Sequence, residues 1–331
     1  MQHHGCVAET CTLGILSDIH YASAAEQARG DDYEYADLRN PLLRHLLRLH
    51  RRFVWLRDPL RQNHLLEAFL QQAGPLDYVV ANGDYSCDSR FVGVSDEAAC
   101  QSVRECLARL RERFGPNFRA NFGDHELGKL SLVGGRGGMR LASWRRATQE
   151  LGMLPFWEVV IGNYVLMGVA SSLVALPVFE ADTLAGERAE WERLRAGHLE
   201  EIRRAFAAVQ PGQRVLLFCH DPSALPFLGR EEAVRRRLPQ IEQTIVGHLH
   251  SPLVLRQSQL LAGMPALGFL GHTAGRLSAA LREARHWRPF HVRLCPALAG
   301  VELLKDGGFY TAQLDCTGNR PARFEFHRLK R

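Results

Sequence analysis

The chain has 331 residues, of which 46% are hydrophobic and 23% are charged, and its formal net charge at pH 7 is +5. This composition is typical of a soluble globular protein, and the length accommodates one large α/β domain or two smaller ones. The charge is too small to indicate nucleic acid as a specific partner.

The sequence also argues against membrane insertion and secretion. No apolar run approaches the ~20 residues that a membrane-spanning helix needs, and residues 1–12 lack the basic and apolar regions of a signal peptide. The eight cysteines include no Cys-x-x-Cys pair. In a chain of this length they are typical of reduced thiols, so we expect a cytoplasmic protein.

Up to residue 250, apolar runs and amphipathic segments predict an alternation of strands and helices. The expected strands cover 12–17, 77–81, 118–122, 157–161, 164–170, 214–219 and 243–246, and the expected helices cover 40–54, 63–73, 95–114, 187–209 and 231–238, with Ser95 as the N-cap of the third helix. Beyond residue 250, segments near 268, 290–295, 309–314 and 322–327 predict antiparallel strands. We expect one domain over residues 1–331, with the part from about 265 to 331 supplying strands of an outer sheet.

Five of the predicted strands end in side chains that can bind a metal ion or move a proton. These side chains are Asp18, His20, Asp84, Asp124, His125, Glu126, His220, His248 and His250. Taken singly, an Asp-x-His or Gly-His-x-His turn is equally well explained as an ordinary polar turn at the surface. Parallel strands present their carboxyl ends along one edge of a sheet, however, so that these side chains can converge.

The combination of carboxylates and imidazoles suits divalent metal ions. His248 and His250 are two residues apart and point to the same side of an extended chain, as do Asp18 and His20. Seven ligands suffice for two ions if one carboxylate bridges them, and Asp84 is the natural choice because it stands alone at its strand end. Two ions about 4 Å apart can hold a phosphoryl group for in-line displacement and activate a water as hydroxide.

In this order, the blocks Asp-x-His, Gly-Asp, Gly-Asp-His-Glu, His and Gly-His-x-His resemble the calcineurin-like metallophosphoesterase family. The resemblance runs from Asp18 to His250. It implies an α/β fold, a four-layer αββα sandwich of two mixed β-sheets flanked by helices, with a dinuclear metal centre at one edge of the sandwich.

The resemblance also implies roles for individual residues. One ion would be held by Asp18, His20 and His250, the other by Asp124, His220 and His248, and both by Asp84. His125 would be catalytic together with Asp84, because its imidazole would stabilise or protonate the leaving oxygen. Glu126 would orient His125 or tie down its loop.

Two positions depart from the pattern of the family. Asp124 stands where the family usually has Asn, so the centre would be more anionic and its ions weaker Lewis acids. Asp88 follows Asp84 at a spacing one residue longer than usual, which makes its expected role in supporting the ligands less secure.

The spacing between Asp18 and Asp84 leaves room for an inserted helical segment at about residues 33–66. From Arg39 to Arg61 it contains seven arginines and one acidic residue, Asp58. Three interpretations remain open for this basic amphipathic helix. Its apolar face packs on the body with the arginines in solvent, it lies on a membrane surface, or it forms a lid in which Arg44, Arg48, Arg51 and Arg52 meet an anionic substrate.

A glycine-rich segment at 134–138 lacks the Gly-Lys-Ser/Thr ending of a phosphate-binding loop, so we interpret it as a flexible connector.

The resemblance predicts a hydrolase of phosphate monoesters, phosphate diesters or pyrophosphates that uses two divalent ions. We expect Mn²⁺, with Fe, Zn or Mg as alternatives, and a phosphorylated small molecule or lipid as substrate. One alternative is a peripheral-membrane pyrophosphatase that acts on a nucleotide-sugar lipid, as in lipid A synthesis, with membrane contact through the basic helix. Another is a catalytically silent scaffold of the same fold, which the complete set of ligand residues disfavours.

Overall fold

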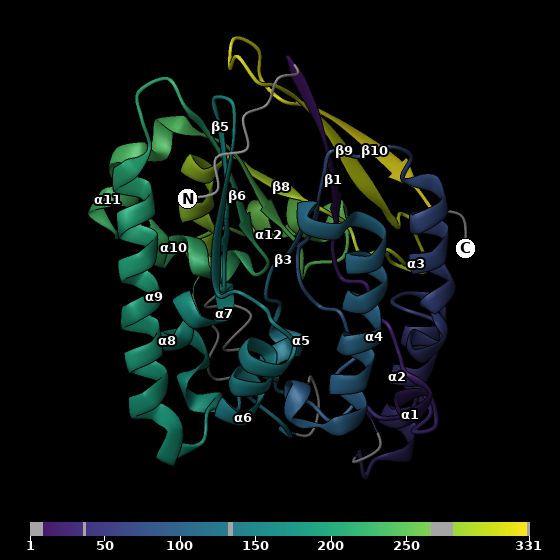
Figure 1. The fold of residues 1–331 in the computed structure, drawn as a ribbon. Helices are drawn as coiled ribbons and strands as arrows, with labels where there is room; N and C mark the ends of the chain where they lie inside the picture. Colours follow the sequence, from purple (N-terminus) through teal and green to yellow (C-terminus); the bar gives the residue numbers. More distant parts are fainter. Residues whose placement is uncertain (1–8, 36–37, 132–134, 264, 266–280, 330–331) are drawn as a thin grey trace.

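Two five-stranded mixed sheets form the centre of the molecule (Figure 1). The computed structural model describes residues 9–35, 38–131, 135–263, 265 and 281–329. In the first sheet, the strand order is β10-β9-β1-β2-β3. Strands β1 (Thr10–Leu16), β2 (Tyr78–Ala81) and β3 (Phe118–Ala120) are parallel, whereas β9 (Gly308–Asp315) and β10 (Arg323–Arg328) add antiparallel partners beside β1.

The second sheet has the strand order β4-β5-β6-β7-β8. Strand β4 (Phe156–Ile161) is antiparallel to β5 (Tyr164–Val169), and β6 (Arg214–Cys219), β7 (Ile241–Val246) and β8 (Val292–Leu294) continue the sheet in parallel. Each sheet therefore contains a run of neighbouring parallel strands whose carboxyl ends share one edge.

Successive side chains of each strand point to opposite faces of the sheet, and those on the inner faces form a buried core between the two sheets. Leu13 and Ile15 from β1 pack there against Leu216 and Phe218 from β6. The alternate positions face outward, which is why the strands are apolar on both sides and need helices to cover them.

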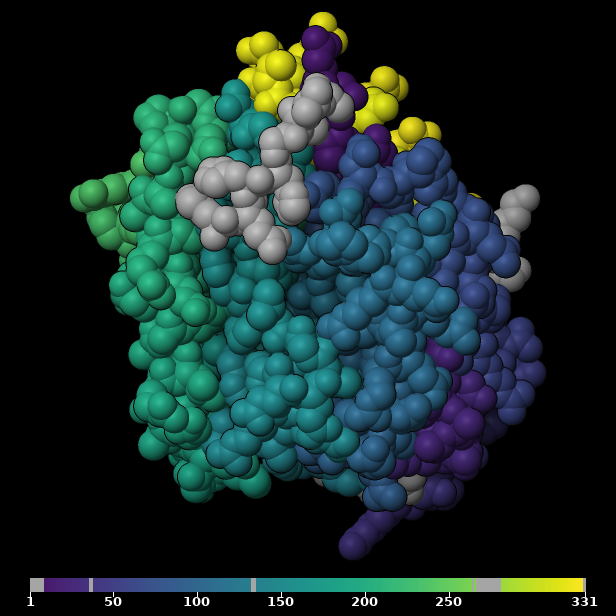
Figure 2. Space-filling view, viewed as in Figure 1, coloured from purple at the N-terminus to yellow at the C-terminus, as the bar shows by residue number. Residues whose placement is uncertain are grey.

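Helices cover both outer faces of the sandwich. On the first sheet lie α3 (Asn63–Gln72) and α4 (Glu97–Phe114), whose apolar sides pack against β2 and β3. On the second lie α9 (Arg188–Ala208), α10 (Leu225–Leu228) and α11 (Glu232–Arg237). The expected four-layer sandwich is therefore confirmed. In the space-filling view, the green flank around α9 and the blue flank around α4 lie on opposite sides (Figure 2).

Shorter elements connect the layers. The other helices are α1 (Ala24–Gln27), α2 (Pro41–Phe53), α5 (Asp124–Leu127), α6 (Leu141–Arg145) with a π-helical turn (Arg146–Glu150), α7 (Ser171–Val174), α8 (Leu176–Phe179) and α12 (Pro252–Leu260). The 3₁₀ turns cover Pro59–Arg61, Gly93–Ser95, Gly115–Asn117, Glu180–Asp182, Ala185–Glu187, Pro222–Ala224, Leu238–Gln240 and Ala284–Phe290. None of the helices in the described part of the chain combines the length and apolar character that crossing a bilayer requires.

Two expectations from the sequence were wrong in detail. The N-cap of α4 is Asp96, whose side chain accepts a hydrogen bond from the Ala99 amide, whereas Ser95 donates its hydroxyl to the Val92 carbonyl.

Strand β8 is parallel to β7 rather than antiparallel, because the intervening α12 and 3₁₀ turn form a crossover connection. Strands β9 and β10 are antiparallel as expected but belong to the first sheet, and the segment near 268 lies outside the described residues.

Helix α2 begins as the sequence predicts, with the Asn40 side chain accepting hydrogen bonds from the amides of Leu42 and Leu43 and Pro41 at the first helical position. The interpretation in which the apolar face of this helix packs on the body does not match its orientation, because that face is exposed. Leu42 retains 66% of its accessible surface, Leu46 53% and Phe53 59%.

Candidate metal centre

Seven side chains that can bind a metal ion converge at the carboxyl ends of five strands. The first sheet supplies Asp18 and His20 after β1, Asp84 after β2 and Asp124 after β3, and the second supplies His220 after β6 and His248 and His250 after β7. The centre therefore spans the edge where the two sheets meet.

The ligand atoms form two compact groups. One group contains Asp18, His20 and His250, and the other contains Asp84, Asp124, His220 and His248; within each group, the ligand atoms all lie within 4.8 Å of one another. These are the residues that the resemblance implies for the two ions.

In the first group, the imidazoles of His20 and His250 are stacked, and their Nε2 atoms are 3.4 Å apart. His250 Nε2 is also 3.4 Å from Asp18 Oδ1. Burial and the neighbouring His20 hold the pKa of His250 well below its ordinary value, so His250 is neutral and presents a lone pair.

In the second group, His220 Nε2 lies 3.2 Å from Asp84 Oδ2 and 3.3 Å from Asp124 Oδ1. His248 Nδ1 lies 2.9 Å from the same Asp124 oxygen. Burial alone would raise the pKa of Asp124, but the charge of His248 and the hydrogen bond from His220 outweigh it, and the pKa lies well below its ordinary value. Asp124 is therefore a carboxylate at neutral pH.

The two groups fit divalent cations. His220 Nε2 is fully buried and makes no hydrogen bond, although two carboxylate oxygens lie nearby. A buried nitrogen without a hydrogen-bond partner is costly unless something else occupies the space between these atoms. Burial would lower the pKa of both rings in this group, but the neighbouring carboxylates raise that of His220 well above its ordinary value and that of His248 to about 9. A bound cation would displace the proton from each ring and satisfy the nitrogens and the carboxylates together.

The backbone at the ligands is strained. Five of the seven candidate ligands adopt a left-handed conformation, namely Asp18 (φ 50°), His20 (50°), Asp84 (59°), His248 (61°) and His250 (60°). This conformation is uncommon for residues other than glycine, and its clustering is typical of functional sites. It turns each side chain back toward the edge of the sandwich.

Two neighbouring glycines make room for the converging loops. A Cβ atom on Gly247 would lie 2.1 Å from Ser17 Oγ and 2.6 Å from Asp18 Oδ2, and one on Gly123 would lie 2.1 Å from Asp84 Oδ1. No other residue type fits at either position without moving a candidate ligand.

His125 lies beside this centre on α5. Its Nε2 is 3.5 Å from Asp84 Oδ2, and its Nδ1 is 2.8 Å from the carbonyl oxygen of Ser86. Burial, with the positive charge of Lys129 nearby, lowers the pKa of His125 to about 3, against the opposing effect of Asp84. With Nδ1 protonated and donating to Ser86, the neutral ring leaves Nε2 directed toward the centre.

Glu126 ties the loops of two ligands together. Its carboxylate accepts hydrogen bonds from the backbone amides of Gly123 (2.7 Å), Asp84 (3.1 Å) and Tyr85 (2.8 Å). Burial and the charge of Asp84 raise the pKa of Glu126 to about 8. Of the two roles considered from the sequence, its contacts match the fixing of the loop.

Asp88 lies one loop further from the centre. Its Oδ1 accepts hydrogen bonds from the amides of Val92 and Gly93, at 3.1 and 2.9 Å. These contacts hold the chain that leads into the following 3₁₀ turn.

The four arginines that the lid interpretation invoked have partners elsewhere. Arg44 donates to the Leu38 carbonyl, Arg48 to Asp32, Arg51 pairs with Glu34 at 2.6 Å, and Arg52 lies over the ring of Phe53. The arginine side of α2 thus packs on the segment just before it. Within the described residues, these contacts do not bring the guanidinium groups to the two ligand groups.

Two residues near the centre were missed from the sequence. Trp55, just after α2, has its ring centroid 5.2 Å from that of His250, and the carbonyls of Trp55 and Val54 accept hydrogen bonds from the amides of Glu302 and Leu303. Lys129 follows α5 and makes a short contact from Nζ to His125 Nε2. Its place four residues after His125 is a signal that could have identified it.

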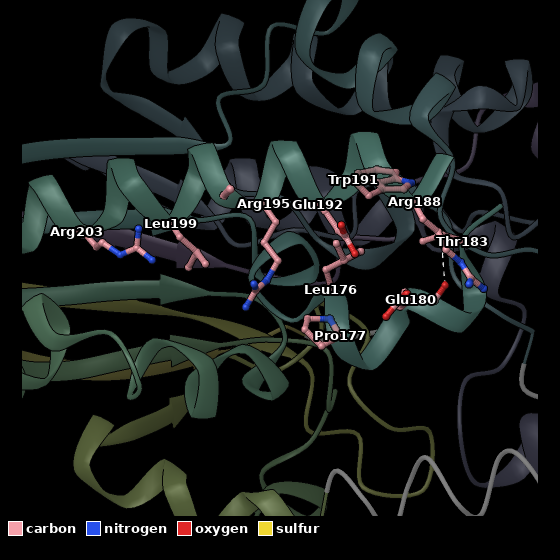
Figure 3. Close-up of a pocket in the computed structure, with 11 residues that line it drawn as sticks. Leu176, Pro177, Glu180, Thr183, Arg188, Trp191, Glu192, Arg195, Leu199 and Arg203 are labelled. Atoms are coloured by element: carbon pink, nitrogen blue, oxygen red, sulfur yellow. Dashed lines mark hydrogen bonds between the residues drawn. The ribbon is translucent and has the colours of Figure 1, made fainter. Parts of the chain in front are cut away.

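A cavity of about 390 Å³ lies away from this centre, between α8 and α9 (Figure 3). Arg188, Arg195 and Arg203 line it together with Glu180 and Glu192, so its charges are mixed. Its lining includes no residue of the two ligand groups.

No family model matches the sequence, and a search of the curated proteins finds no match. Among solved structures, the chain is similar to a dimetal phosphatase from Danio rerio, at 14% sequence identity and a TM-score of 0.36 over 72% of this chain and 82% of that chain. It is also similar to a purple acid phosphatase from yellow lupin (Lupinus luteus) seeds, at 10% identity and a TM-score of 0.35 over 73% of this chain and 38% of that chain.

Proposed function

We propose that this chain is a metallophosphoesterase of the calcineurin-like family, which hydrolyses phosphate esters or phosphoanhydrides at a centre of two divalent ions. One observation carries the proposal: two groups of ligand atoms, each drawn from both sheets, lie at the sandwich edge, and Asp84 of one group is within 4.8 Å of His20 of the other and of His125. Asp18, His20 and His250 would hold one ion, Asp124, His220 and His248 the other, and Asp84 would bridge them.

The ions, when bound, would supply Lewis acidity toward the phosphoryl oxygens and toward the attacking water. The side chains of the protein would position the reacting groups. The carbonyl of Ser86 fixes the ring of His125, so that Nε2 faces the centre. This Nε2 carries no proton of its own, and the proton that the ring would pass to the leaving oxygen would come from the Lys129 ammonium group in contact with it. Glu126 holds the loops of Asp84 and His125 at a constant separation, which positions both groups before substrate binds.

The experiment is a hydrolysis assay with an aryl phosphate monoester, an aryl phosphate diester and a nucleoside diphosphate derivative. We expect turnover with Mn²⁺ that chelation abolishes and added metal restores. Fe, Zn and Mg are the other ions to compare. His125→Ala should lower kcat by about 10²–10⁴-fold, the usual contribution of a positioned acid or base, without changing the metal content.

One outcome would contradict the proposed hydrolase activity. A purified, folded chain that binds no metal and hydrolyses none of these substrates would be the silent scaffold that the ligand set disfavours.

A finer proposal concerns the substrate. We propose that it is phosphorylated and linked to a lipid or a nucleotide, and that the protein acts in the cytoplasm at the surface of a membrane. A pyrophosphatase for a nucleotide-sugar lipid is one such activity. The supporting observation is α2, whose exposed Leu42, Leu46 and Phe53 lie on a helix that leads directly to Trp55 beside His250.

Charge favours an anionic lipid surface over other partners of this helix. Arg52, Arg57 and Arg61 are exposed at its end and in the loop that follows. A helix with large apolar side chains next to exposed arginines is typical of binding at the interface of anionic membranes.

A further inference from the structure

A lysine stands at the proposed catalytic centre. Lys129 Nζ contacts His125 Nε2, which is 3.5 Å from the proposed bridging carboxylate of Asp84. The side chain therefore brings a full positive charge to the point where the leaving group of a substrate would lie.

The backbone holds Lys129 in this place. Gly128 has a φ of 99°, and a Cβ atom there would lie 2.5 Å from the carbonyl oxygen of Gly138. The chain then forms the base of a hairpin, in which the Gly138 amide donates to the Lys129 carbonyl at 3.0 Å and Leu130 pairs with Gly137. Gly137 and Gly138, from the glycine-rich segment interpreted as a connector, thus pair with Leu130 and Lys129 and help to position this lysine.

The Lys129 ammonium group lies among carboxylates of the proposed centre. Three of the seven proposed ligands are the carboxylates of Asp18, Asp84 and Asp124. Burial would lower the pKa of Lys129, but Asp124 and Glu34 raise it above its ordinary value, so the ammonium group is charged at neutral pH. A phosphate substrate is itself anionic, so an ammonium group at this place would attract it in addition to the two proposed ions.

We propose that Lys129 is a phosphate-binding residue whose ammonium group contacts a phosphoryl oxygen of the bound substrate. An ammonium group has three N–H donors, so it can contact His125 and a phosphoryl oxygen at the same time. Lysine acts here as a point charge, as it does in other phosphate sites. The inference rests on the proposed function, since it assigns a substrate contact at the same centre.

The test compares wild-type protein with Lys129→Met and Lys129→Arg, each loaded with Mn²⁺. The matched control is Arg204→Met, which removes a positive charge from an exposed position on α9. Two quantities are measured: bound Mn²⁺ per chain by elemental analysis, and the Kd of inorganic phosphate by titration calorimetry. Where a substrate is turned over, KM and kcat are measured as well.

We expect Lys129→Met to keep its metal content and to weaken phosphate binding by about tenfold or more, the usual effect of losing a charge-assisted hydrogen bond. KM should rise and kcat/KM should fall. Lys129→Arg should recover most of the affinity, and Arg204→Met should match the wild type. If Lys129→Met does not fold by circular dichroism, Lys129→Gln takes its place.

Two results would overturn the inference. In one, phosphate affinity changes less than twofold in Lys129→Met. In the other, the variant loses metal, so that Lys129 only balances the buried carboxylates. If the wild type binds Mn²⁺ and phosphate but hydrolyses no ester, while Lys129→Met still weakens phosphate binding, the proposed function is refuted and the phosphate contact of Lys129 is supported. A wild-type protein that binds no Mn²⁺ would overturn both.

Discussion

The loops that carry the ligands approach each other so closely that single atoms decide whether they fit. Gly247 lies between Ser17, Asp18 and His220, and a Cβ atom would come within 3 Å of all three side chains. The geometry of the centre thus depends on residues that carry no chemistry of their own.

This close approach gives a prediction for Gly247→Ala. The added methyl group should push Asp18 and His220 apart, destabilise the fold by about 1–3 kcal/mol, as overpacking usually does, and weaken Mn²⁺ binding. The measurements are urea unfolding and metal titration.

The matched control is Gly197→Ala on the exposed side of α9, where a Cβ atom would have nothing within 4 Å. That change should raise stability by about 0.5–1 kcal/mol through helix propensity and leave metal binding unaltered. Equal metal affinity in wild type and Gly247→Ala would contradict this account of the centre.

At the scale of single residues, the sequence predicted which side chains meet but not how. The spacing of Asp18 with His20, and of His248 with His250, identified side chains that share one face of the chain. The left-handed conformations at these residues depend on hydrogen bonds across the sandwich, such as that from the His248 amide to Asp18 at 3.1 Å. The spacing of four residues between His125 and Lys129 is a local signal, but their contact also depends on the pairing of Lys129 with Gly138, which that spacing does not specify.

At the scale of elements, most helices and strands of the sandwich follow from periodicity, but the direction that α2 faces does not. The pattern of α2 gives one apolar and one basic side, and either could face the body. The choice is made by the segment before it, where Asp32 and Glu34 pair with Arg48 and Arg51. Likewise, the parallel direction of β8 depends on the crossover before it, which the strand's own residues do not encode.

The exposed side of α2 predicts binding to anionic membranes. Leu46→Glu and Phe53→Glu should each lower partitioning onto vesicles of phosphatidylglycerol and phosphatidylcholine by about tenfold or more, because a buried large apolar side chain contributes about 1.5–3 kcal/mol. Sedimentation with the vesicles measures the bound fraction.

The matched control for this experiment is Leu154→Glu, since Leu154 is 57% exposed outside α2. It should bind the vesicles as the wild type does. All three substitutions should leave the melting temperature nearly unchanged, because each side chain is already exposed. If wild-type protein does not sediment with anionic vesicles, or does so equally with neutral ones, the membrane proposal fails.

At the scale of the whole molecule, the centre joins the two halves of the sandwich. Four candidate ligands follow strands of the first sheet and three follow strands of the second, so bound ions would connect the sheets at one edge. Without ions, the sheets are joined by apolar packing, as with Leu13 and Phe218, and by a few hydrogen bonds, such as those from the Asn82 and Asn121 side chains to the carbonyls of Ile245 and Phe218.

Removal of the ions should therefore lower global stability. At a free Mn²⁺ concentration 100 times its Kd, each ion contributes about 2.7 kcal/mol to the folded state. Chelation should lower the melting temperature measured by calorimetry, and the shift should shrink when Asp84→Asn removes the proposed bridge. A melting temperature that is independent of metal would show that the sheets are not joined in this way.

The division of the ligands between two sheets also sets when the centre can appear during folding. His20 and His250, whose rings stack, are 230 residues apart in the chain. Closing a loop of that length is slow compared with forming a local helix or hairpin, and neither sheet alone presents a complete set of ligands. The capacity to capture metal should therefore arise last in refolding, after the helices have formed and the sheets have docked, so that metal uptake reports the moment at which the sandwich is complete.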